Sequence, residues 1–459
     1  MQNERKEREL IPVSQRHTNN NLTQPPKHEK KSISKRQQDK AREALYLPSH
    51  KNRLLPDINV IGDKNAEGEV IRVKSGVDRI LLVLILILIC FGSVMVFSAS
   101  YADAQSRYGD SYYFIKRQIV FVALGLGAMV LTMNLPYKWF RFWAVPAYIV
   151  TIGLLVVVLA MGLVGGGAQR WIGIGSFTFQ PSELAKITLV LVLAWYYTTF
   201  QDTMKYKPWK MLSQNPQKRK QERKLWFRAN FTYGIFFPGC LILIIVILVA
   251  LEKHLSGIII LGLIGLATMY AAGCNGGILG GIIGVAAGAV VAFAFLTDYT
   301  KRRIDIWLSP ESYPLDGGWQ TLQGMNAIGS GGLFGLGLGG SRQKYSYVSE
   351  PQNDFIFTIV CEELGFIGAV AVILLFVLFV WRGYVIAMKA PDAFSGIVAM
   401  GITSKVAIQV LLNIAVVTNS IPNTGISLPF FSYGGSSLVM LFVEMGILLS
   451  ISRYSYQRR

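Results

Sequence analysis

Long apolar runs alternate with short polar segments from residue 77 to the C-terminus. A helix needs roughly 20 largely apolar residues to cross a bilayer core of about 30 Å, and ten runs approach that length. The pattern therefore predicts an all-α integral membrane protein with ten transmembrane helices. The runs lie near 77–99, 117–135, 143–164, 182–199, 230–251, 256–273, 277–297, 355–381, 395–418 and 431–452.

The first 75 residues differ in composition from everything that follows. They hold 16 Lys/Arg and 10 Asp/Glu, with many Asn, Gln and Ser, and they open with MQNERKEREL, which lacks the apolar segment of a cleaved signal peptide. Such a composition buries too little surface to offset chain entropy. We expect residues 1–75 to be a disordered, basic cytoplasmic tail and residues 76–459 to be the membrane domain. The tail is either a solvated anchor or a docking segment for a partner or for anionic lipid.

Basic residues between the runs indicate the orientation. Residues 200–229 hold nine Lys/Arg against Asp202 and Glu222. With ten spans, this loop and the smaller basic loops fall on the side of the tail, which the positive-inside rule assigns to the cytoplasm. Both termini are then cytoplasmic, and residues 298–354 form one long structured extracellular loop between the seventh and eighth helices. The smaller basic sites are Lys138, Arg141, Arg382, Lys389, Arg453, Arg458 and Arg459.

Composition narrows the functional classes. The chain is 52% hydrophobic and only 16% charged, with a net charge of +18, whereas a soluble protein has about a quarter charged residues. This composition disfavours a soluble nucleic-acid binder, and four cysteines in 459 residues exclude a disulfide scaffold. Most of the positive charge lies in cytoplasmic segments, so it reflects topology and contact with membrane lipids rather than an acidic partner.

Three polar clusters fall on the predicted outer side. The first, at 165–186, contains Arg170 and a helix start at which Glu183 and Lys186 share one face at i, i+3. Ionisable groups inside a membrane helix are costly and usually functional, although a mutual ion pair that only locks the helices remains an alternative.

The second cluster is the long loop, especially 307–354. Its carboxylates Glu311, Asp316, Glu350 and Asp354 can serve as bases or metal ligands. Its glycine-rich run lacks the GK[ST] of a nucleotide-binding loop. The third cluster pairs Lys405, at the start of an i, i+4, i+8 polar face, with the serine- and glycine-rich segment LPFFSYGGSS at 428–437. Such a broken helix entrance is tolerated where it lines a polar cavity or is buried in protein.

Three segments strongly resemble the SEDS family of shape, elongation, division and sporulation proteins. They are RWIGIG followed by FQPSELAK, then GLFGLGLGGSRQKYSYVSEPQNDFIFTIVCEELG, then PNTGISLPFFSYGGSSL. The resemblance covers about residues 77–452. The long polar N-terminus is more similar to division or sporulation members than to elongation members.

This resemblance implies an inverting peptidoglycan glycosyltransferase in the bacterial cytoplasmic (inner) membrane. Such enzymes polymerise lipid II, the undecaprenyl-diphosphate-linked disaccharide pentapeptide, at the outer face. They act with a class B penicillin-binding protein and with division or elongation proteins. The reaction requires a base for the acceptor hydroxyl and cations for the leaving diphosphate.

The chain departs from the family pattern at the expected base. In many relatives an aspartate stands immediately before the proline that is Pro314 here, but this chain has Tyr313. A phenol with a pKa of about 10 is a poor base at neutral pH. The nearest carboxylates are Asp316 and Glu311, and we expect Asp316 to be the base because the two glycines after it let the loop shift.

Eleven residues are expected to bind the substrate, and a divalent cation (Mg or Mn) with unknown ligands is a further expectation. Two other functions stay open: a lipid II flippase, or a catalytically impaired scaffold for the penicillin-binding protein. The substitution at Tyr313 is the observation that keeps the scaffold open. The expected binding residues are Arg170, Glu183, Lys186, Gln320, Lys344, Glu350, Asp354, Glu363, Lys405, Ser432 and Ser436.

Overall fold

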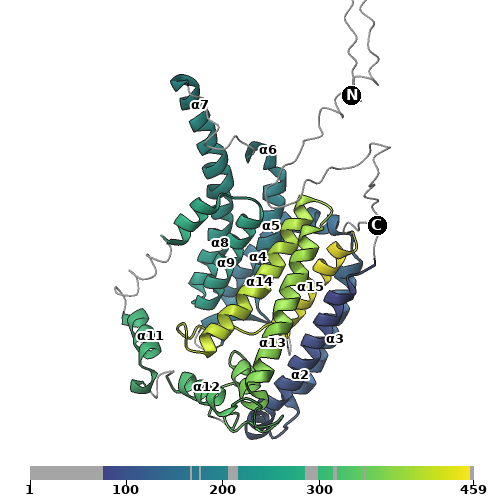
Figure 1. Ribbon diagram of the computed structural model, residues 1–459, viewed down its shortest axis with the longest axis vertical. Helices are drawn as coiled ribbons and strands as arrows, with labels where there is room; N and C mark the ends of the chain where they lie inside the picture. The colour runs from purple at the N-terminus through teal and green to yellow at the C-terminus, as the bar shows by residue number, and fades with distance from the viewer. Residues whose placement is uncertain are drawn as a thin grey trace, which may run out of the picture. The chain divides into compact units, whose positions relative to one another are not determined.

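The computed structural model describes residues 76–454, apart from 166–167, 175–176, 205–214, 285–297, 314–317 and 346. The predicted tail 1–75 and most of the predicted run 277–297 lie outside the described residues. The described part of the chain is mostly helical (Figure 1).

Seven segments of the described part are long and apolar enough to cross a membrane. Together they make the protein a multi-pass membrane protein. They are α2 (Arg79–Tyr108), α3 (Tyr113–Asn134), α4 (Tyr137–Met161), the continuous stretch Lys218–Leu251 that ends in α8 (Phe237–Leu251), α13 (Ile356–Met388), α14 (Ala393–Val417) and α15 (Gly435–Ser452).

The other three predicted runs are helical where the structure describes them, but they do not stand out as spans. The 19-residue α5 (Pro181–Thr199) carries Glu183 and Lys186 near its start, and its side chains from 185 to 194 are all buried. A helix enclosed by other helices needs no apolar face for lipid, so it tolerates these charges. The 17-residue α9 (Leu255–Ala271) is shorter than a typical span, and residues 276–284 are helical.

A small sheet lies between α4 and α5, and it corrects the prediction of an all-α protein. Strands β1 (Leu163–Gly165), β2 (Ala168–Ile174) and β3 (Phe177–Phe179) pair antiparallel in the order β1-β2-β3. The register places Ile172 opposite Phe179. Aromatic and β-branched residues favour strands, but these segments are too short and too rich in glycine to show a clear alternation.

The polar segments gather at opposite ends of the helices. The short α6 (Gln201–Met204) and α7 (Pro216–Phe227) come from the predicted basic loop, and the π-helical η2 (Arg228–Phe236) follows at the start of the predicted run 230–251. The elements α11 (Asp298–Leu308), η3 (Pro310–Ser312) and α12 (Gly318–Ser330) come from the predicted long loop. Figure 1 shows α6 and α7 at one end and α11 and α12 at the other.

Candidate active site

A cavity of about 750 Å³ opens at the end of the molecule that carries α11 and α12. Its walls come from the last turn of α2, β2, the first turns of α5 and α9, α11, α12, and two loops that precede α13 and α15. Its volume falls within the range of about 300–1,000 Å³ that is usual for ligand sites. Cations, carboxylates and amides line it, so it suits a polar, charged ligand.

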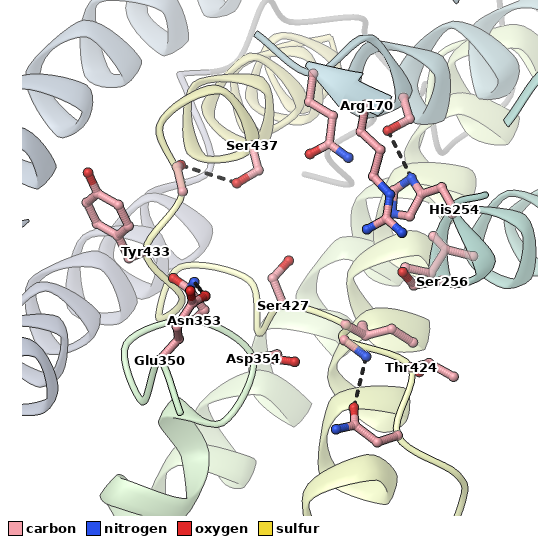
Figure 2. A pocket seen from close by; sticks show the side chains of 18 of the residues that line it. Arg170, His254, Ser256, Glu350, Asn353, Asp354, Thr424, Ser427, Tyr433 and Ser437 are labelled. Carbon is pink, nitrogen blue, oxygen red and sulfur yellow. Dashed lines mark hydrogen bonds between the residues drawn. The ribbon is translucent and has the colours of Figure 1, made fainter. Parts of the chain in front are cut away.

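One side of the cavity is cationic. Arg170, on β2, donates from Nη2 to the carbonyl of Lys253 at 2.9 Å, and Figure 2 shows it next to His254. The His254 Nδ1 lies 3.5 Å from Ser182 Oγ. Burial, aided by the charge of Arg170, lowers the pKa of His254 to about 4, so this imidazole is neutral at pH 7. The positive charge on this side therefore comes from Arg170 and from Lys186 in α5.

Two buried ion pairs lie near this side. The predicted contact between Glu183 and Lys186 is confirmed, at 2.7 Å, and both residues line the cavity. Deeper in the bundle, Lys405 of α14 pairs with Glu444 of α15, also at 2.7 Å. Glu183 balances the charge of Lys186, so this pair adds little net charge to the cavity wall.

The opposite side is acidic. Glu350, Asn353 and Asp354 project from the loop before α13 (Figure 2). The Asn353 Nδ2 donates to Glu350 Oε2 at 2.7 Å. Glu350 itself has a left-handed backbone with φ of 49°, a conformation that costs energy for any residue but glycine.

A buried amide fixes the backbone around Asp354. The Asn413 Nδ2, on α14, donates to the carbonyls of Asp354 and Ile426 at 2.7 Å each. The Tyr433 backbone N–H donates to the carbonyl of Gln352 at 2.8 Å. These bonds tie the acidic loop to the segment before α15, so Asp354 is held in place rather than carried on a free loop.

The carboxyl of Asp354 is the best-suited proton acceptor among the described residues that line the cavity. Burial, reinforced by the nearby Glu350, raises its pKa to about 6, against the opposing effect of its own backbone N–H. A pKa just below neutral keeps the group ionised at pH 7 yet basic enough to take a proton. Glu183, in contrast, is engaged by Lys186.

Six of the eleven predicted binding residues line this cavity. Lys405 and Ser432 instead line a smaller pocket that shares Ser427 and Ser437 with it. Ser436 is buried, and its hydroxyl has no hydrogen-bond partner within the described residues. The six are Arg170, Glu183, Lys186, Gln320, Glu350 and Asp354.

Of the two predicted catalytic residues, the structure describes only Glu311, which does not line the cavity. Glu311 is exposed in η3. Asp316 lies outside the described residues, so its position relative to the cavity is untested.

Lys344 and Glu363 lie in a separate buried cluster that neither pocket includes. The Lys344 Nζ is 3.1 Å from Glu363 Oε1 and donates to the carbonyl of Gly339 at 2.7 Å. Ser98 Oγ of α2 donates to the same glutamate at 2.7 Å. This cluster holds a loop against α13, and the charges of Lys344 and Glu363 are directed at each other.

The sequence motifs did not predict several of the residues that line the cavity. His254 and Ser256 belong to none of the three polar clusters, and Asn353 and Tyr433 appear there only as members of longer motifs. No spacing rule links β2, α9 and the loop before α15. The sequence signal for these lining residues was that polar side chains occur there in otherwise apolar surroundings.

A buried carboxylate lies beside the cationic side. Glu252, at the end of α8, is 2% exposed, and neither carboxylate oxygen has a hydrogen-bond partner within the described residues. Burial raises its pKa to about 7, and the nearby Arg170 only partly offsets this effect. An ionised Glu252 therefore destabilises the folded protein.

Replacing this carboxyl by an amide should stabilise the protein at high pH. Because the folded pKa lies above the usual 4.5, the wild type loses stability as pH rises from about 4.5 to about 7. We expect Glu252→Gln to raise the unfolding temperature at pH 8, by an amount equivalent to about 1–3 kcal/mol, and to change it little at pH 5. Thermal unfolding in detergent at both pH values measures this. The exposed Glu311→Gln is the control, and an equal shift at both pH values would contradict the explanation.

No group of three or more His, Cys, Asp or Glu that could hold a metal ion occurs within the described residues. The acidic side offers Glu350 and Asp354, which is too few for a site made of protein ligands alone. Magnesium is commonly held by one or two carboxylates together with substrate phosphates. The donor set therefore fits a cation only if a phosphate-bearing ligand completes the site.

Comparison with known proteins decides the family. The family model FTSW_RODA_SPOVE, described as a cell cycle protein, matches residues 78–457. The chain belongs to this family. The resemblance seen in the sequence motifs is thus confirmed, and the match begins where the predicted tail ends.

Members of the FtsW/RodA/SpoVE family resemble the chain over nearly their whole length. Stage V sporulation protein E of Bacillus subtilis (strain 168) is 39% identical over 401 residues, which cover 83% of this chain and 98% of that protein. A probable peptidoglycan glycosyltransferase FtsW of Geobacter sp. (strain M18) is 37% identical over 381 residues, covering 82% and 97%.

Solved structures of the FtsW/RodA/SpoVE type share the fold. A chain from a study of the structural coordination of polymerization and crosslinking by a peptidoglycan synthase complex has a TM-score of 0.63 at 26% identity. That alignment covers 82% of this chain and 98% of the other. The rod shape determining protein RodA of Thermus thermophilus has a TM-score of 0.58, also at 26% identity, covering 83% and 98%.

Proposed function

We propose that the protein is a peptidoglycan glycosyltransferase that polymerises lipid II into glycan strands. Family membership and relatives named as probable peptidoglycan glycosyltransferases support this. The observation that carries it is the cavity in which Arg170 faces Asp354. A cation for a diphosphate and a base for a hydroxyl stand on opposite walls of one space.

The reaction follows from this arrangement. The acceptor sugar 4-hydroxyl attacks the anomeric carbon of the donor from the acidic side, and Asp354 takes its proton. The bond between that carbon and the diphosphate oxygen breaks as the new glycosidic bond forms, with inversion. Arg170 and the neutral His254 stabilise the departing diphosphate by charge and hydrogen bonding.

Asp316 is the alternative base, with Glu311 a weaker one. Both belong to the segment that carries Tyr313 in place of the usual aspartate. Asp354 is favoured because it lines the cavity and its backbone is fixed by Asn413. If the catalytic base instead lies in this segment, displaced from position 313, Tyr313→Asp should raise the activity.

A divalent cation is a further proposal. Glu350 would supply a carboxylate ligand and the substrate diphosphate the other oxygens, so that Asp354 stays free as the base, and the charge of the cation would help to neutralise the leaving group. Magnesium or manganese suits such oxygen ligands.

The proposed membrane arrangement has ten helices, both termini in the cytoplasm, and the cavity at the outer face of the bacterial cytoplasmic membrane. The basic α7 lies at the end opposite α11 and α12, as the positive-inside rule requires. We further propose a class B penicillin-binding protein as partner, with division or elongation proteins. The similar chain from a peptidoglycan synthase complex supports this.

The decisive experiment is polymerisation of purified lipid II in detergent by the protein with its penicillin-binding partner. Detergent has no two sides, so a flippase would show no activity there. We expect long glycan strands from the wild type and a loss of about 10²–10³-fold in Arg170→Ala, since removing one charge-stabilising group typically costs this much. Lys116→Ala removes an exposed cation that pairs with Asp110 away from the cavity, and it should retain activity.

Each competing function has its own result. Activity only in sealed vesicles, measured as lipid II movement, would support a flippase. If the Arg170→Ala variant itself polymerises lipid II at the full rate, the proposed diphosphate site is wrong. Partner activity that survives every cavity substitution would support a scaffold.

A further inference from the structure

A glycine-rich loop, residues 331–340, displays large apolar side chains that the proposed function does not use. The sequence is GGLFGLGLGG, and its four exposed apolar residues are Leu333, Phe334, Leu336 and Leu338, with Phe334 80% exposed. Glycines at 332, 335, 337 and 339 have positive φ angles, so the backbone turns repeatedly between them. So dense an exposed apolar patch usually marks a contact surface.

The loop is fixed to α13 and is not a free tether. The backbone N–H groups of Leu336 and Gly337 donate to the carbonyls of Glu362 and Glu363, at 2.9 and 3.0 Å. In return, Phe366 N–H donates to the carbonyl of Gly332 at 2.8 Å. These bonds form where α13 is broken at Gly365, which has a φ of 67°. The apolar side chains are therefore presented in a defined direction.

Two side-chain contacts between α2 and α13 indicate how deep this loop lies in the membrane. Arg382 Nη2 pairs with Asp78 at 2.7 Å near one end, and Ser98 Oγ donates to Glu363 at 2.7 Å near the other. About 20 residues separate these two contacts along each helix. At 1.5 Å per residue this is ~30 Å, which equals the thickness of the hydrocarbon core. With the charged pair of Asp78 and Arg382 at the inner boundary of the core, Glu363, to which the loop is hydrogen-bonded, lies at the outer boundary.

The surroundings of the loop match a bilayer surface. Large exposed apolar side chains continue along α13 from Phe366 and Ile367 through Leu374 and Leu378 to Trp381, the face that a spanning helix turns to lipid. Exposed tyrosines occur just beyond the same level, where aromatic residues favour the headgroup region. They are Tyr101 and Tyr108 of α2 and Tyr345 and Tyr347 after the loop.

We propose that the glycine-rich loop inserts into the outer leaflet, with Leu333, Phe334, Leu336 and Leu338 among the phospholipid acyl chains. The loop joins α12, which lines the cavity through Gln320 and Thr321, to the acidic segment at 349–354. It thereby anchors this wall of the cavity to the membrane surface. This inference rests on the proposed orientation in the membrane and is independent of the enzymatic activity.

Spin-label accessibility in lipid nanodiscs tests the depth. A nitroxide is placed through Phe334→Cys in a background in which Cys90, Cys240, Cys274 and Cys361 are alanine. Leu374→Cys provides the lipid-facing reference and Ser309→Cys, exposed before η3, the aqueous reference. We expect the ratio of oxygen to nickel-chelate accessibility at 334 to be severalfold above that at 309 and below that at 374, which lies deeper in the membrane.

Two results would overturn the proposal. Nickel accessibility at 334 as high as at 309 would place the loop in water. Protection at 334 from both oxygen and nickel would indicate a protein contact, such as a second copy of the chain.

A second measurement leaves the native cysteines intact. A photoreactive benzoylphenylalanine at position 334 should form adducts with phospholipid on irradiation, and the same group at position 309 should not. Adducts with protein alone at position 334 would equally overturn the proposal.

Discussion

Asparagine in place of Asp354 is expected to lower the rate of lipid II polymerisation by about 10²–10⁴-fold, the usual contribution of a general base. The amide preserves the size of the side chain but cannot accept the proton of the attacking hydroxyl. Because Asn413 holds the backbone carbonyl of Asp354 and not its side chain, the loop should keep its position. The loss should therefore appear in kcat much more than in KM.

The pH dependence gives a second readout. Burial raises the pKa of Asp354 to about 6, and only the ionised form is a base. Wild-type activity should therefore rise with pH through about 6 and fall about tenfold for each unit below it. The residual activity of Asp354→Asn should lack this step.

Asp110→Asn is the matched control. Asp110 is exposed, and its pKa is lowered by its hydrogen bond with Lys116, so it does not titrate near pH 6. If Asp354→Asn stays fully active while Asp316→Ala is inactive, the base lies in the segment around Tyr313, and Asp354 only shapes the cavity.

Methionine in place of Lys405 is expected to destabilise the protein by about 3–5 kcal/mol, because it leaves Glu444 as a buried charge without its partner. Lys405 is 3% and Glu444 1% exposed, and their atoms are 2.7 Å apart. The result should be a large drop in unfolding temperature and in the yield of monodisperse protein.

The double variant Lys405→Met/Glu444→Gln separates charge from packing. It removes both charges and should recover most of the lost stability, since neutralising a buried pair costs far less than breaking one. The pair of Glu183 and Lys186 stays intact in both variants. Equal destabilisation by the single and the double variant would show that the shape of Lys405, and not its charge, matters.

Local patterns predicted local features well. Apolar runs located the helices, and i, i+3 spacing predicted the contact between Glu183 and Lys186. The same runs could not show that α5 is enclosed by the bundle, because burial depends on neighbours distant in sequence. The sequence patterns did not predict the sheet at 163–179, because its strands are only three to seven residues long.

Contacts between distant segments were beyond sequence reasoning. Lys344 and Glu363 were expected to bind the substrate, yet they form a buried pair across 19 positions. Lys405 and Glu444, and the opposition of Arg170 to Asp354, likewise depend on how helices pack. Charged residues at membrane depth identified candidates, but only the fold separates those that face a cavity from those that face one another.

The left-handed backbone of Glu350 has a consequence for how this position can vary. With a φ of 49°, any residue other than glycine is strained by roughly 1–2 kcal/mol, and branched side chains fit worst. Glycine would relieve that strain but would remove the carboxylate that binds Asn353 and faces the cavity. Selection for thermal stability would thus favour glycine at position 350, whereas selection for a charged cavity wall would preserve glutamate.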